Sequence, residues 1–132
     1  MLMNPMEFDV RTGRQGAATE QLNAIDLQHL RRYTMGDVKL EKEVLELFLG
    51  QLPETIKALS LAASERDWQM AAHTLKGSGR AVGAWRVALL AEHAEHPATI
   101  MNAALRSQAI ARIEEAAEEA RAFIRSAYPN AS

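Results

Sequence analysis

The sequence predicts an all-α fold: an antiparallel four-helix bundle with a short additional N-terminal helix. Apolar residues recur at three- and four-residue spacing from residue 26 onward, which indicates amphipathic helices. Clusters of β-branched residues at period two, which a sheet would need, are missing. Short connections between long helices favour antiparallel neighbours. The first 20 residues show no sustained periodicity, so we expect a mobile tail over 1–20 and one domain over 21–128.

In the first part of the domain, the sequence predicts a short helix followed by a long one. Asp26 is a suitable N-cap for the short helix DLQHLRRY, in which Leu27 and Leu30 face inward. A TMGD turn then leads into a helix over residues 38–63, which Pro53 should kink or split. We expect its buried stripe to consist of Leu40, Val44, Leu47, Phe48, Leu52, Ile56 and Leu59.

Three further helices are expected over residues 68–82, 84–95 and 103–128. Asp67 is positioned to cap the first of them and Gly83 to end it. In the second, the apolar pattern turns Trp85 and Leu89 outward. Either the N-terminal tail or the last helix covers them, or they form a surface for a partner or for self-association. The inward residues of the three helices are Trp68, Ala71, Leu75, Gly79 and Val82; Val87, Leu90, Ala91 and Ala94; and Ile110, Ile113, Ala117, Ala120, Ile124 and Ala127.

Composition excludes several classes of function. The 132 residues contain no cysteine, which excludes disulfides and thiolate metal sites. The net charge of −2 argues against a nucleic-acid-binding protein. No apolar run approaches the roughly 18–20 residues of a membrane span, and the segment MLMNPMEFDVRTGRQ lacks the apolar core of a signal peptide. We therefore expect a soluble, cytoplasmic protein that contacts neither nucleic acid nor membrane.

His73 is the most informative residue. On a helical wheel it lies opposite the apolar stripe of its helix, on the face that also carries Gln69, Lys76, Gly77 and Arg80. A single helical histidine is usually a core residue or an idle surface residue, but its neighbours argue for a function. Glycine costs a helix interior roughly 1 kcal/mol relative to alanine, so glycines at 77 and 79 indicate that something bulky approaches the backbone. Alternatively, the helix stops at Lys76 and KGSG is a loop.

The local charge indicates chemistry with a phosphoryl group. No acidic residue lies between Asp67 and Glu92, whereas Lys76, Arg80 and Arg86 are basic, so we expect a positive patch around His73. A neutral imidazole, with a pKa of about 6.5, is available at pH 7 to attack phosphorus. The Lys76 ammonium could then pair with the phosphoryl oxygens.

The segment AHTLKGSGRAVGA resembles the phosphoacceptor segment of histidine-containing phosphotransfer (HPt) domains, whose signature is His-x-x-Lys-Gly followed by a glycine that closes the helix. The layout of residues 22–125 is also similar to that of the family. The resemblance implies that His73 is phosphorylated, that Lys76 stabilises the phosphate, and that Gly77, with Gln69 and Arg80 beside it, forms the docking surface for a receiver domain. Gly79 departs from the family, which more often has Ser or Ala there.

The resemblance implies a phosphocarrier rather than a true enzyme. It would relay a phosphoryl group between receiver-domain aspartates, or from a sensor or hybrid histidine kinase to a response regulator, within a two-component phosphorelay. No Gly-rich ATP-binding loop is present. The family implies no cofactor on this chain itself, with Mg²⁺ expected on the partner receiver domain. The sequence names neither the cognate kinase and receiver nor the direction of transfer.

Two other functions remain open from the sequence. One is a non-phosphorylated helical interaction or dimerisation module that uses Trp85 and Leu89. The other is a metal-binding bundle in which His93 and His96, near Glu92, act as ligands. No fourth ligand is evident and Pro97 follows at once, so we expect no metal site. His29 is expected to be exposed and idle.

Overall fold

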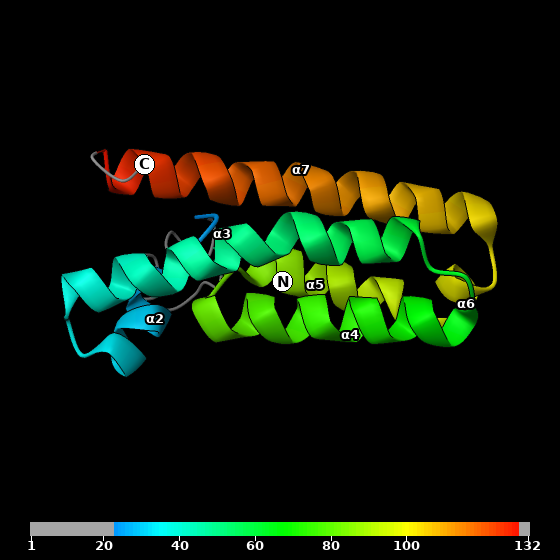
Figure 1. Ribbon diagram of the computed structural model, residues 1–132, viewed down its shortest axis with the longest axis horizontal. Helices are drawn as coiled ribbons and strands as arrows, with labels where there is room; N and C mark the ends of the chain where they lie inside the picture. Colours follow the sequence, from blue (N-terminus) through cyan, green and yellow to red (C-terminus); the bar gives the residue numbers. More distant parts are fainter. Residues whose placement is uncertain (1–22, 130–132) are drawn as a thin grey trace, which may run out of the picture.

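The computed structural model describes residues 23–129 as an antiparallel helical bundle, and the tail expected over 1–20 lies outside these residues (Figure 1). Helices α3, α4, α5 and α7 alternate in direction, and each contacts two of the others: α3 and α5 both contact α4 and α7. No strand occurs in the described range, so the all-α prediction is confirmed. The helices are α2 (Leu27–Thr34), α3 (Val38–Ser60), α4 (Glu65–Val82), α5 (Trp85–Ala94), α6 (Pro97–Ile100) and α7 (Ala103–Ala127).

Side-chain caps set the starts of most helices. Asp26 accepts a hydrogen bond from the His29 backbone N–H and caps α2, as predicted. The prediction that Asp67 caps α4 is wrong. Ser64 is the N-cap, and its hydroxyl accepts from the backbone N–H of Asp67 at 3.0 Å, so the helix begins at Glu65. Serine and aspartate are equally good N-caps, and the residue pattern alone did not separate them.

The short helix α6 was not predicted. His96 is its N-cap and accepts from the Ala98 backbone N–H through Nδ1, and Pro97 occupies the first helical position. Proline is favoured there because its missing N–H would have no partner in the helix.

The buried stripe of α3 differs from the expected one. Leu47 is 67% exposed and Leu40 is also exposed, whereas Leu45, which the sequence analysis left out, is fully buried. Phe48, Leu52, Ile56 and Leu59 are buried as predicted. The stripe starts at a charged residue, Glu41, so a search for apolar residues alone misplaced only its first part. The buried residues of α3 are Glu41, Leu45, Phe48, Leu52, Ile56 and Leu59.

Helix α3 also runs without a break through Pro53, so of the two expected effects, a kink or a split, the split does not occur. Proline removes one backbone hydrogen bond, that to the carbonyl of Leu49. Pro53 itself is exposed. The helix ends at Ser60, three residues before the predicted end.

The predicted core of the other helices is largely confirmed. All five inward residues of α4 are buried. In α5, Leu90 is only half-buried and Ala88 is buried instead; in α7, Ile110 is half-buried and Ala127 exposed, whereas Ala116 is buried. Alanine therefore contributes much of the α5 and α7 faces, which allows these helices to approach closely.

Two glycines bring α4 and α5 together. Gly83 ends α4 with a φ of 81°, a left-handed conformation that glycine adopts without strain. A Cβ at Gly79 would lie 3.0 Å from the Ala88 nitrogen and 3.1 Å from the Ala84 carbonyl oxygen. Glycine at position 79 therefore has a structural reason, because α5 occupies the space that a serine or alanine side chain would need.

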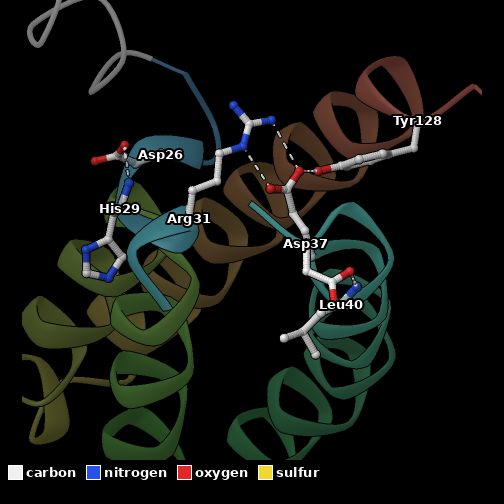
Figure 2. Close-up of polar contacts among 7 residues, drawn as sticks. Asp26, His29, Arg31, Asp37, Leu40 and Tyr128 are labelled. Carbon is white, nitrogen blue, oxygen red and sulfur yellow. Dashed lines mark hydrogen bonds and ion pairs between the residues drawn. The ribbon is translucent and has the colours of Figure 1, made fainter. Parts of the chain in front are cut away.

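A buried carboxylate fastens three segments at one end of the bundle (Figure 2). Glu41 of α3 is 1% exposed. It accepts hydrogen bonds from Arg31 of α2, at 2.8 Å from Nε and 3.2 Å from Nη2, and from the Tyr128 hydroxyl that follows α7. The hydrogen bond from Arg31, with that from Tyr128, holds the pKa of Glu41 below its usual range although burial opposes this. Burial and then the bond to Glu41 raise the pKa of Tyr128 to about 12.

Exchanging each glycine of α4 for alanine should give opposite effects on stability. Gly79→Ala should lower the free energy of unfolding by about 1–3 kcal/mol, because the methyl group overpacks the contact with α5. Gly77→Ala should raise it by about 1 kcal/mol, since the position is helical and no atom lies within 4 Å of the added Cβ. Urea unfolding of both variants measures this. A loss of stability in both would contradict the open environment of Gly77.

Tyr128→Phe should destabilise the protein by about 1.5–3 kcal/mol near neutral pH, because a hydrogen bond to a buried carboxylate is lost. The pKa of Tyr128 is raised on folding, so its contribution is complete below pH 10 and is lost as the pH rises toward about 12. The difference in unfolding free energy between wild type and variant should therefore shrink over that interval. Urea titrations from pH 8 to 12 test this, and a constant difference would contradict it.

Candidate functional site

Helix α4 carries His73 near its middle, on a face turned away from the core. The helix is continuous from Glu65 to Val82, so the alternative of a KGSG loop is wrong. The His73 side chain is 73% exposed. The other exposed residues predicted for this face lie one or two turns away on either side: Gln69, Gly77 and Arg80.

A carboxylate from the neighbouring helix links His73 to Lys76. Glu95, the C-cap of α5, places one oxygen 2.9 Å from His73 Nδ1 and the other 2.7 Å from Lys76 Nζ. The side chains of Lys76 and Glu95 are each only 16% exposed. The helical wheel placed Lys76 on the polar face, which suggested a solvated side chain. In the structure its side chain is instead mostly buried against Glu95.

Glu95 is held in its charged form. Burial raises its pKa, but the hydrogen bonds from Lys76 and His73, with the positive charge of Lys76, outweigh burial and leave the pKa below its usual range. Near neutral pH the group is therefore a carboxylate, which accepts hydrogen bonds and donates none.

The expected positive patch around His73 is largely neutralised, which corrects the prediction. Each of the three basic residues has an acidic partner on another helix: Lys76 contacts Glu95 of α5, Arg80 lies 3.8 Å from Glu92 of α5, and Arg86 lies 2.6 Å from Glu119 of α7. The residues between Asp67 and Glu92, on which the prediction was based, do not include these three carboxylates. The face around His73 therefore combines paired charges with an exposed imidazole.

His29 was expected to be exposed and idle, and this prediction is wrong. The residue joins α2 to the C-terminal end of α4. It is half-buried, and its Nε2 donates to the Arg80 carbonyl at 3.0 Å. Its ring lies edge-on to Trp85, with 4.8 Å between ring centroids. The Trp85 Nε1–H donates to Asp26 at 2.9 Å, so Trp85 is half-buried beneath α2 rather than turned outward. Leu89 is 52% exposed, as predicted.

His93 and His96, at the end of α5, do not form a metal-binding site with other described residues. His96 uses Nδ1 to cap α6, and His93 is exposed. Among the described residues, no three His, Asp or Glu side chains come close enough together to hold a metal ion. Every helix within residues 23–129 is too short or too polar to cross a lipid bilayer.

An open groove lies beside the site, between α3 and α4. It has a volume of about 460 Å³ and includes Thr74, the residue after His73. Leu61 and Met70 are exposed at this groove, which gives it apolar character, and Glu54 and Asp67 add negative charge.

The model of the Hpt domain family matches residues 43–123, more than half of the chain and all of α4 and α5. The chain belongs to the Hpt domain family. The matched range contains His73, Lys76 and Gly77 of the predicted signature, together with Glu95. Comparison with curated proteins and with solved structures gave no match.

Glu95, which contacts both His73 and Lys76, is the residue of the candidate site that the sequence analysis missed. The sequence pattern instead indicated its neighbours Glu92, His93 and His96 as possible metal ligands. The antiparallel pairing of α4 and α5 offered a signal, because residues about equally far from the connecting turn lie level with each other. His73 stands 10 residues before Gly83, and Glu95 stands 11 residues after Ala84.

Proposed function

We propose that this Hpt domain accepts a phosphoryl group on His73 and passes it to a receiver-domain aspartate in a two-component phosphorelay. The observation that carries the proposal is the exposed imidazole of His73 within the segment that matches the Hpt family. Among the described residues, its Nε2 makes no hydrogen bond, so this nitrogen is accessible to a partner. The donor is either another receiver domain or a sensor or hybrid histidine kinase.

Lys76 is suited to stabilise the phosphoryl group although it already contacts Glu95. An ammonium group has three N–H donors, and the bond to Glu95 uses one of them. The remaining donors can pair with phosphoryl oxygens next to His73 as charge-assisted hydrogen bonds. We expect Mg²⁺ and the acidic pocket to belong to the receiver, so this chain acts as a phosphocarrier. A cytoplasmic location agrees with this role and stays a prediction.

Gly77 is suited to receive the partner. Its exposed position follows His73 by one helical turn, and no atom lies within 4 Å of where its Cβ would be. A receiver can therefore approach the α4 backbone beside the imidazole, with Gln69 and Arg80 at the edges of the contact. The alternative of a dimerisation module through Trp85 and Leu89 is weakened, because Trp85 packs beneath α2.

His73→Gln should abolish labelling of the protein by a phosphorylated receiver domain, because the nucleophile is removed. The label on wild type should be labile in acid and stable in base, as expected of phosphohistidine. His93→Gln is the matched control, since His93 is exposed on α5 and should not affect labelling. Incubation with radiolabelled receivers measures both variants. Label that persists on the His73 variant would exclude His73 as the acceptor.

Gly77→Leu should block phosphoryl transfer almost completely while leaving the fold intact. The leucine side chain would occupy the space through which the receiver approaches His73. Gly50→Leu is the control, because Gly50 is also an exposed helical glycine with open space around it, but lies on α3. Transfer rates and melting temperatures of both variants should be compared. Normal transfer by Gly77→Leu would contradict docking at this position.

A further inference from the structure

The outward side of α3 carries a glycine that no contact within the described fold explains. Gly50 lies near the middle of the helix, it is exposed, and no atom of residues 23–129 lies within 4 Å of where its Cβ would be. Glycine in a helix interior costs roughly 1 kcal/mol relative to alanine. Close approach of another backbone from outside the described fold would offset this cost.

Leucine side chains flank Gly50 on this side of the helix. Leu47 is 67% exposed and Leu61 is 69% exposed. At about 100° per residue, both lie within about 60° of Gly50 around the helix axis. Helix α3 contacts α4 and α7 and lies diagonally from α5, so this side faces away from the bundle (Figure 1). The exposed residues here, called the Gly50 surface below, are Glu43, Glu46, Leu47, Gly50, Glu54, Lys57 and Leu61.

Charges are placed symmetrically about Gly50. Glu43 precedes Gly50 by seven residues and Lys57 follows it by seven. Seven residues make almost two turns, so each charge lies nearly in line with Gly50, about 10 Å along the helix. The two are about 21 Å apart and cannot pair with each other. Within residues 23–129, neither side chain forms an ion pair. The surface is therefore complementary in charge to its own copy turned end to end.

We propose that a second copy of this chain packs on the Gly50 surface, with the two α3 helices antiparallel and crossing at Gly50. Such an interface has a two-fold axis, so each contact occurs twice. Glu43 of one copy lies level with Lys57 of the other, which gives two ion pairs. Glycine at the crossing lets the two backbones approach closely, and Leu47 of each copy is covered beside it.

The other two glutamates fit this arrangement. Glu46 and Glu54 lie four residues on either side of Gly50, but on opposite flanks of the line from Glu43 to Lys57. In an antiparallel helix pair, each flank meets the same flank of the other helix. Glu46 therefore approaches Lys57 of the second copy, whereas Glu54 approaches its leucine side chain at position 47. The two glutamates do not face each other.

The dimer goes beyond the proposed function and does not depend on it. His73 contacts Glu95 of α5, the helix diagonal to α3, so the Gly50 surface and the imidazole lie on different sides. Stable protein interfaces bury roughly 1,200–2,000 Å². The outer side of a single helix supplies less, so the dimer should be weak and should depend on protein concentration.

Sedimentation equilibrium of the full chain tests the proposal. Wild type should pass from monomer to dimer between roughly 10 μM and 1 mM. Gly50→Leu should weaken dimerisation by roughly 10-fold or more, because the side chain separates the helices at their crossing point. Gly77→Leu is the matched control, since Gly77 is an exposed helical glycine with open space on α4, and it should dimerise as wild type does. A wild type that stays monomeric at the highest concentration would overturn the proposal. So would a Gly50→Leu dimer of unchanged affinity.

Exchange of the charges tests the antiparallel pairing. Lys57→Glu and Glu43→Lys should each weaken dimerisation by roughly 10-fold, because each creates two like-charge contacts. The double variant restores opposite charges and should recover most of the affinity. Arg112→Glu, on the exposed side of α7, changes the net charge as Lys57→Glu does and should leave the dimer intact. A double variant that dimerises no better than the single variants would overturn the arrangement. Circular dichroism identifies any variant that does not fold, and the concentration dependence of wild type then decides.

Discussion

The close contact between α4 and α5 is the constraint on which the site depends. Gly79 has no side chain, so the backbone at the start of α5 can pack directly against the α4 backbone, in the space that a Cβ would need. Gly83 reverses the chain between the two helices. As a result α5 runs back alongside α4, and its last residues arrive level with His73. Glu95 can bond both His73 and Lys76 only because of this packing, so a larger residue at 79 would disturb the site without touching it.

The same C-terminal end of α4 is also fixed through α2, and the buried carboxylate of Glu41 makes this possible. Removing a carboxylate from water costs several kcal/mol unless it is paired. Arg31 and Tyr128 supply that pairing and tie α2 and the end of α7 to α3. Helix α2 in turn bonds the Arg80 carbonyl through His29. The C-terminal end of the helix that presents His73 is thereby held by both α5 and α2.

The sequence predicted those features that are local to one helix. Periodicity and capping residues gave the helix order, and the wheel placed His73, Gly77 and Arg80 on one exposed face. Contacts between helices escaped it: the pairing of Glu95 with His73, the neutralisation of Arg86 by Glu119, and the enclosure of Trp85 by α2. The first part of the α3 stripe was misplaced because a buried glutamate has the sequence signature of a surface residue until its partners, far away in sequence, are known.

Gly77 and Gly79 lie two residues apart in one helix for opposite reasons. Each costs the helix roughly 1 kcal/mol relative to alanine, so stability alone would select neither. At position 79 the contact with α5 offsets this cost. At position 77 nothing within the described fold offsets it, because the space beside the Cα is open. A glycine that the fold does not need, one turn from an exposed imidazole, supports the proposal that a partner docks on this face of α4.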